Sequence, residues 1–260
     1  MIKFFRQIRE QLLTENKFSK DLMYAIGEIV LVVIGILIAL QINNWNEERK
    51  DSIELENYLI KIADNIDQDI RTLNRLQVRR DTVFIKAKRS AKLLMEQDFT
   101  DFATMIGGVR CFYEFYFSAN KGGYEALKNS QFLGRIKNSL VDSLLTQYYV
   151  GVESIEKSEN GYNTFIERME VELNSSIDQT PIFEFIQSRE YADEHEVDFE
   201  NQEWIKKNQE ALMPYLKSNA FKSAVFRTAL QKNDHYQRSI RTGTALTKEI
   251  RKGVSINSVP

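Results

Sequence analysis

The ionisable residue in the most unusual surroundings is Glu28, which lies within a long apolar run. Residues 29–40 are twelve consecutive apolar residues, and over residues 22–42 the only polar members are Glu28 and Gln41. A carboxyl group in so apolar a helix is unfavourable, and such residues usually mark a functional site. Three interpretations remain open: contact between helices of an oligomer, an ion or proton pathway, or a shallow position beside lipid headgroups.

Two small residues fall on the same helix face as Glu28. Glu28, Gly35 and Ala39 are separated by 7 and 4 residues, which places them on one stripe of a helix. Gly35 and Ala39 form a small-xxx-small pair, the spacing that lets two membrane helices approach closely. We therefore expect this face to join copies of the chain into a homo-oligomer.

The length of the apolar run fits a bilayer. About 20 helical residues, each rising 1.5 Å, cross a hydrocarbon core of about 30 Å. Tyr24 and Trp45 bracket the run, as aromatic residues do at membrane interfaces. The sequence predicts one transmembrane helix over residues 20–45, an uncleaved signal anchor in contact with the lipid bilayer. Three amides at its second end either bond between helices or are solvated by the interface: Gln41, Asn43 and Asn44.

The flanking charges predict the orientation of the span. Residues 1–20 contain five Lys or Arg and residues 43–62 contain three. The more basic side usually remains in the cytoplasm, so we expect a cytoplasmic N-terminus and residues 46–260 outside the cytoplasm. Apolar and basic residues also alternate at helical spacing over residues 1–18. This pattern predicts a cytoplasmic amphipathic helix on an anionic leaflet.

Other candidate chemistry is sparse. The acidic run around His195 suggests either a divalent cation site with oxygen ligands or a solvated loop, and it lacks the EF-hand spacing. The sequence Lys121-Gly122-Gly123 lacks the rest of a phosphate-loop pattern. Cys111 is the only cysteine, and the chain has two histidines. We expect no enzyme activity, no cofactor and no metal, and the net charge of −2 gives no footprint for nucleic acid.

Three tyrosines form the remaining candidate site. Tyr148 and Tyr149 end the stretch 124–149, and Tyr124 begins it. Tyrosines at such positions more often fill a core than bind a ligand. A tyrosine-lined ligand pocket inside a helical bundle is the alternative.

Helical periodicity dominates the rest of the chain. Residues 53–97 contain neither Gly nor Pro and carry apolar residues at steps of 3 and 4, which predicts a long stalk helix that continues from the span. The aromatic stretch 109–117 is either a strand or a buried helix, and its helical neighbours favour a helix. Further helices are expected over residues 139–169 and 221–251. The fold class is therefore all-α, with an up-down helical bundle in residues 46–260.

Two stretches resemble an uncharacterised family of bacterial membrane proteins, a domain of unknown function. The first is the YAIGE…ALQINNWNE signature within residues 18–50. The second is residues 124–149, where Leu127, Ser130, Ile136 and the Tyr148–Tyr149 ending fit, whereas Gln131 stands in place of a usual glycine. The resemblance implies a single-pass protein of the bacterial inner membrane with a periplasmic helical domain. It implies no activity.

These observations favour a non-enzymatic structural or interaction protein. It would self-associate through its transmembrane helix and present the helical domain to an envelope protein partner. The alternatives are a sensory or ligand-binding module that signals through a partner, and an ion- or proton-coupled oligomer that uses Glu28.

Overall fold

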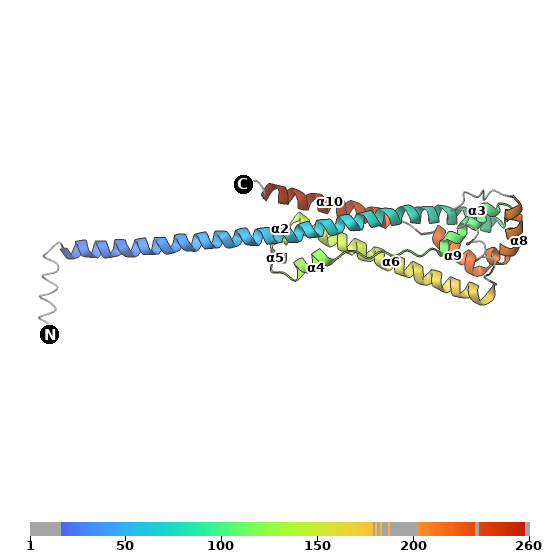
Figure 1. Cartoon of the computed structure of the whole chain (residues 1–260), viewed down its shortest axis with the longest axis horizontal. Coiled ribbons are helices and arrows are strands. Elements are labelled where there is room, and N and C mark those ends of the chain that lie inside the picture. Colours follow the sequence, from blue (N-terminus) through green and yellow to red (C-terminus); the bar gives the residue numbers. More distant parts are fainter. Residues whose placement is uncertain are drawn as a thin grey trace. The chain divides into compact units, whose positions relative to one another are not determined.

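The structure is a computed structural model that describes residues 17–178, 202–231 and 234–257, together with Thr180, Phe183 and Gln187. In this part of the chain every regular element is a helix, which confirms the all-α prediction (Figure 1). The elements are α2 (Lys17–Glu96), α3 (Phe102–Gly107), the 3-10 helix η1 (Gly108–Phe112), α4 (Gly122–Lys128), α5 (Leu133–Ile136), α6 (Leu140–Ser176), α8 (Gln202–Lys217), α9 (Asn219–Ala229) and α10 (Asp234–Asn257). The predicted amphipathic helix, apart from residues 17 and 18, and the acidic run around His195 lie outside the described residues.

The chain divides into two units, residues 1–57 and 58–260. The first unit contains the beginning of α2, whose apolar side chains are exposed at Leu22 and from Tyr24 to Trp45. This part of α2 is long and apolar enough to cross a membrane, and it is the one candidate span among the described residues. α2 continues without a break to Glu96, so the long helix predicted over residues 53–97 is confirmed as part of α2.

The core of the second unit is built on three helices that share one spacing. Their buried residues recur at alternating steps of 3 and 4, the heptad pattern of helices that pack side by side. On α2 this stripe is Ile62, Ile66, Asp69, Leu73, Leu76, Arg80, Val83, Ala87, Ser90 and Leu94. On α6 it is Leu145, Tyr148, Val152, Ile155, Glu159, Tyr162, Ile166, Met169 and Leu173. On α10 it is Tyr236, Ser239, Gly243, Leu246 and Ile250.

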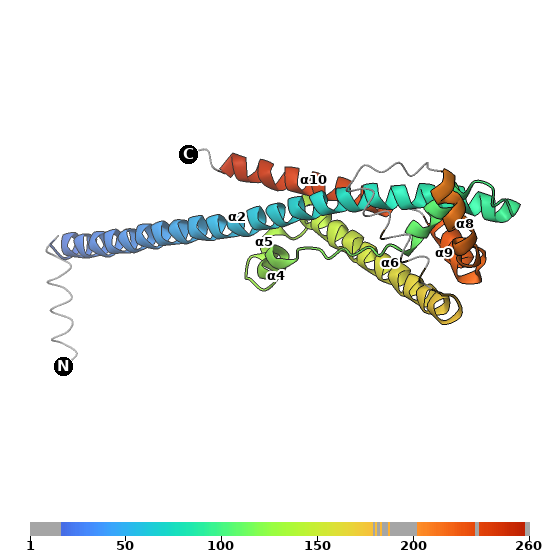
Figure 2. The same ribbon diagram turned by 45° about the vertical axis from the view of Figure 1, so that its right-hand side comes forward.

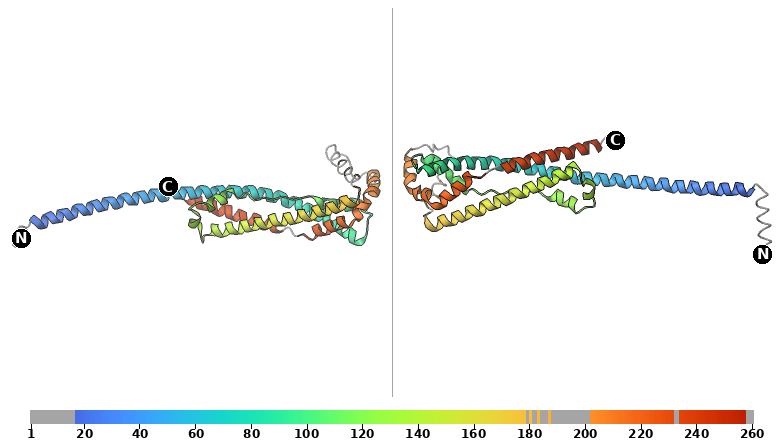
Figure 3. Two further views of the ribbon diagram at one scale, coloured as in Figure 1. Left: turned by 90° about the horizontal axis from the view of Figure 1, so that it is seen from below. Right: turned by 180° about the vertical axis from the view of Figure 1, so that it is seen from behind.

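Contacts across the core give the directions of the three helices. Asp69 meets Tyr148 and Arg80 meets Glu159, and both pairs are 79 residues apart, so the second half of α2 runs parallel to α6. α10 runs the opposite way, because Tyr236 contacts Glu159 whereas Gly243 lies against Tyr148. Figures 2 and 3 show α10 returning alongside these two helices. Gly243 allows this close approach, since a Cβ there would be 2.9 Å from Cε2 of Tyr148.

Two parallel helices need a connection that returns along the bundle, and residues 113–121 provide it. We call them the return segment. The helix favoured for residues 109–117 is wrong beyond Phe112, where η1 ends and the backbone becomes extended at Tyr113. α4 follows, and Gly123 lies so close to α2 that a Cβ would be 2.9 Å from the backbone nitrogen of Ile62. This close packing accounts for the glycine at position 123.

The last predicted helix is divided in two. α9 ends at Ala229 and α10 begins at Asp234, so a single helix over residues 221–251 is wrong. The start of α9 is fixed by Ser218, whose hydroxyl accepts a hydrogen bond from the amide of Phe221 (3.1 Å). α3, η1, α8 and α9 pack against one another at the end of the second unit where α2 ends (Figure 1).

Candidate functional site

Two polar layers interrupt the apolar core of the second unit. The first, here called the arginine layer, consists of Arg80, Glu159 and Tyr236, one residue from each of the three long helices. The second, here called the aspartate layer, consists of Asp69 and Tyr148. All five residues are at most 4% exposed. Buried charges need partners, so these layers are the most demanding positions of the core.

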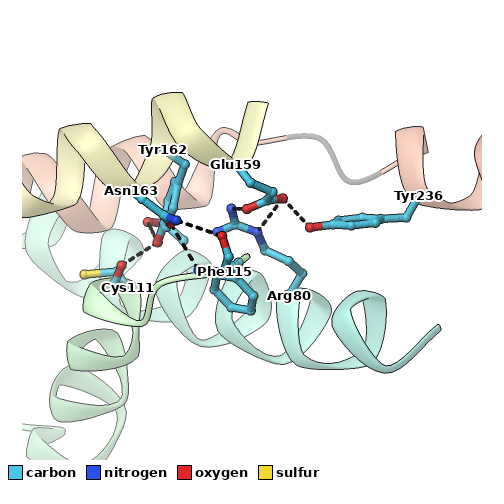
Figure 4. A network of polar contacts seen from close by, with 8 residues as sticks. Arg80, Cys111, Phe115, Glu159, Tyr162, Asn163 and Tyr236 are labelled. Carbon is cyan, nitrogen blue, oxygen red and sulfur yellow. Dashed lines mark hydrogen bonds and ion pairs between the residues drawn. The ribbon is translucent and has the colours of Figure 1, made fainter. Parts of the chain in front are cut away.

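In the arginine layer, one carboxylate binds two donors (Figure 4). Nε and Nη2 of Arg80 donate to the two oxygens of Glu159, with Nε 3.4 Å from Oε1. The hydroxyl of Tyr236 donates to the same Oε1. The ion pair joins α2 to α6, and the tyrosine adds α10, so one cluster of side chains connects the whole bundle.

Two aromatic rings enclose the guanidinium group of Arg80. Its central carbon is 4.0 Å from the ring centroid of Phe115 and 3.8 Å from that of Tyr162. Such cation–π contacts are strongest where water is excluded, as here. The Tyr162 hydroxyl donates to the backbone oxygen of Cys111, and burial raises the pKa of Tyr162 to about 12. The ring therefore stays neutral and holds the arginine from one side.

Side chains of the helices bind the backbone of the return segment. The amide of Asn163 donates to the backbone oxygen of Phe115 (2.7 Å) and accepts from its nitrogen (3.1 Å). The backbone nitrogen of Ala119 donates to Glu156 (2.8 Å), and that of Asn120 donates to Asp69 (3.0 Å). An extended segment without a neighbouring strand needs other partners for its buried polar groups, and these side chains supply them.

The polar contacts of the arrangement hold the helices together, and burial shifts the pKa values of two nearby groups. Burial raises the pKa of the Cys111 thiol, which keeps it protonated and weakly nucleophilic. Burial likewise lowers the pKa of His235, whose Nε2 has no hydrogen-bond partner. Over the described ranges, no group of three His, Cys, Asp or Glu residues is placed to hold a metal ion.

The predicted tyrosine site lies next to the aspartate layer. The rings of Tyr124 and Tyr149 are stacked with centroids 4.4 Å apart, and Tyr148 meets Tyr149 edge-on at 5.3 Å. The hydroxyl of Tyr148 donates to Asp69 (3.0 Å), and burial raises the pKa of both groups. The structure therefore brings the three tyrosines together, with their rings in contact with one another. A ligand pocket at this place stays a prediction.

The predicted span residues lie along the exposed first part of α2. Glu28, Gly35 and Ala39 are exposed, and a Cβ at Gly35 would have no neighbour within 4 Å. At the second end, the side-chain amide of Asn43 donates to Glu47 (3.2 Å). The other interface residues are likewise at the surface of this part of α2: Tyr24, Gln41, Asn44 and Trp45. Their roles in association or ion coupling stay predictions.

Sequence reasoning missed the arginine layer. Arg80 falls on the heptad stripe between Leu76 and Val83, and Glu159 falls between Ile155 and Tyr162. The sequence does contain a signal for this pair. Each residue is a charge on an otherwise apolar stripe, and the two charges are opposite.

Comparison with known proteins adds a family to this geometry. Neither the curated proteins nor the solved structures include a match to this chain. A family model does match, over residues 28–158, which are half of the chain and include most of the candidate span, the return segment and the first part of α6. The chain belongs to the family of unknown function DUF6090.

Proposed function

We propose that this chain is a membrane-anchored, non-enzymatic interaction protein that uses its helical domain to bind envelope partners. The observation that carries the proposal is the exposure of residues 22–42. The large apolar side chains of this stretch, from Leu22 to Ile42, have exposed fractions of 46–77% where the structure describes them. Only two residues of the stretch are polar, so almost all of the exposed surface is apolar. Burying such a side chain contributes about 1.5–3 kcal/mol, so this stretch needs an apolar environment. A bilayer supplies one.

The orientation is part of the same proposal. The five Lys or Arg residues before the span, against three after it, favour a cytoplasmic N-terminus. The helical domain is then periplasmic. In that position, its role is to contact other proteins of the envelope.

The anchor is tested by charging the span. Replacing Leu31 and Ile34 with arginine should move the chain from the membrane pellet to the supernatant in alkaline carbonate extraction, because each central arginine costs about 2.5–3.5 kcal/mol. The matched control places two arginines at Val78 and Leu140, which are exposed in the second unit. This control should remain in the pellet. A wild-type chain found in the supernatant would contradict the anchor.

A single added cysteine in the same protein reports the orientation. Cys111 is buried, so a membrane-impermeant maleimide should react only with a new cysteine such as Lys61→Cys, at an exposed position. We expect labelling once the outer membrane is permeabilised and the inner membrane is intact. Labelling only after the inner membrane is broken would reverse the orientation.

Self-association is proposed to occur through Glu28, Gly35 and Ala39. It is supported by the lack of any side chain at Gly35 and by the exposure of this face in a single chain. Close helix approach in lipid depends on such small residues. The ion-coupled alternative requires the same face, with Glu28 in contact with water.

The association face is tested by leucine substitutions. The double variant Glu28→Leu, Gly35→Leu should show fewer crosslinked oligomers in detergent. A leucine side chain in place of Gly35 separates the helix backbones, and one in place of Glu28 cannot form a hydrogen bond. Val30→Leu with Val33→Leu is the control, since these residues lie on the opposite face. Equal crosslinking of both variants would exclude the proposed face.

A further inference from the structure

An apolar groove lies between the end of α2 and α9, and its lining contains no residue of either polar layer. Its volume is about 810 Å³. Its floor is formed by the less exposed lining residues, which are the buried Ala91 and the half-buried Ala229, Phe84 and Phe226. The alanines leave space where larger side chains would fill the contact between the two helices. The groove is therefore a consequence of small residues at these two positions of α2 and α9.

The rim of the groove exposes unusually large apolar side chains. Met95 is 75% exposed and Leu230 is 81% exposed, the highest values among the large apolar residues described in the second unit. Ile85 adds a third, 49% exposed. Clustered exposure of this kind marks an interaction site, whereas single exposed residues need no explanation. Methionine in particular adapts to flexible apolar ligands.

The groove is also strongly basic. Lys88, Arg89 and Lys92 line it, and no acidic residue is among its described lining residues. The residues of α9 that line the groove, Phe226 and Ala229, are uncharged. The ion pair between Lys92 and Glu96 is 3.9 Å long with both side chains exposed, and it contributes little. The charge of the groove therefore favours an anionic occupant.

The size of the groove favours a small ligand over a partner helix. Its volume falls within the range of about 300–1,000 Å³ that small-molecule sites have. Its length from Phe84 to Met95 is about 16 Å, eleven residues of helix. A partner helix about 10 Å wide would make only about three turns of contact along it.

We propose that this groove binds an anionic single-chain amphiphile, with its acyl chain on the floor at Ala91 and Ala229 and its carboxylate or phosphate head at Arg89 and Lys92. The proposal does not require self-association or a particular orientation of the span. It gives the helical domain a lipid-like ligand of its own, separate from the bilayer around α2.

The test uses the full chain in nanodiscs of zwitterionic lipid and a long-chain fatty acid with a diazirine on its chain. After irradiation, mass spectrometry should find labelled peptides at residues 84–95 and 226–230 in addition to the span. Unlabelled oleate and oleoyl lysophosphatidate should each compete, and the stronger competitor identifies the head group. Oleoyl lysophosphatidylcholine should compete poorly, because its head has no net charge. Labelling confined to residues 22–42, or equal competition by the zwitterion, would overturn the proposal.

Variants separate the two parts of the groove. Arg89→Glu with Lys92→Glu should weaken labelling of the groove about tenfold, as should Met95→Asp with Leu230→Asp, since each pair removes charge or apolar contact at an exposed position. Lys61→Glu with Arg71→Glu, exposed on the same helix, is the control and should label as the wild type does. All three variants should stay in the membrane pellet, so a loss of labelling is distinct from a failed anchor. Unchanged labelling in both groove variants would contradict the site.

Discussion

Replacing Arg80 with methionine should lower the free energy of unfolding by about 3–5 kcal/mol, one of the two largest effects that we expect of a single substitution. Glu159 is 2% exposed and would lose the guanidinium group that binds both of its oxygens. Phe115 and Tyr162 would lose the cation between their rings. Urea unfolding of the full chain in detergent, followed by circular dichroism, measures the change.

The reason for the effect is the unpaired carboxylate, and a combined variant shows this. Arg80→Met together with Glu159→Leu and Tyr236→Phe removes all the polar groups of the layer and should regain most of the lost stability, because a well-packed apolar layer can replace a buried ion pair. The control is Arg238→Met, which breaks an exposed pair with Asp234 at 2.9 Å. It should change stability by less than about 0.5 kcal/mol. If Arg80→Met changes the free energy of unfolding as little as this control does, the arginine layer does not stabilise the bundle.

Replacing Asn163 with leucine should cost about 2–5 kcal/mol and release the return segment. Leucine has nearly the shape of asparagine but leaves the amide and carbonyl of Phe115 without partners, and each unsatisfied group costs about 1–3 kcal/mol. Hydrogen–deuterium exchange should rise in residues 113–121 more than in α6. Urea unfolding gives the overall loss of stability.

An asparagine at the surface supplies the comparison. Asn74→Leu removes an amide that donates to the backbone oxygen of Ile70 (2.9 Å) at an exposed position of α2. Water can replace that bond, so its effect should stay below about 0.5 kcal/mol. Unchanged exchange of residues 113–121 in Asn163→Leu would show that the segment is held by packing alone.

Periodicity predicted the helices well, because each apolar stripe is a property of nearby residues. The continuous course of α2 and the helix of α6 are of this kind. The return segment is different, since aromatic residues such as Phe115 suit a buried helix equally well. Its extended backbone depends on Asn163 and Glu156, which lie far along the chain. A local pattern carries no information about such partners.

Local patterns also give no information about the partners that the two polar layers of the core require. A search for apolar residues passes over Asp69 and Arg80, although both lie on the stripe. Their burial is possible only because Tyr148 and Glu159 face them from α6. The break between α9 and α10 was missed because residues on both sides of it, such as Val225 and Tyr236, are buried and suggest one continuous stripe.

The equal separation of the two polar pairs fixes the alignment of α2 with α6. Asp69 and Arg80 are eleven residues apart, as are Tyr148 and Glu159. Sliding one helix by a heptad would place Arg80 opposite Val152 or Ile166, and the aspartate layer would fail in the same step. Insertions in the exposed turns between α2 and α6 can therefore be tolerated, because they leave the alignment of the two helices unchanged. A single residue inserted within α2 between the two layers would leave at most one of them intact.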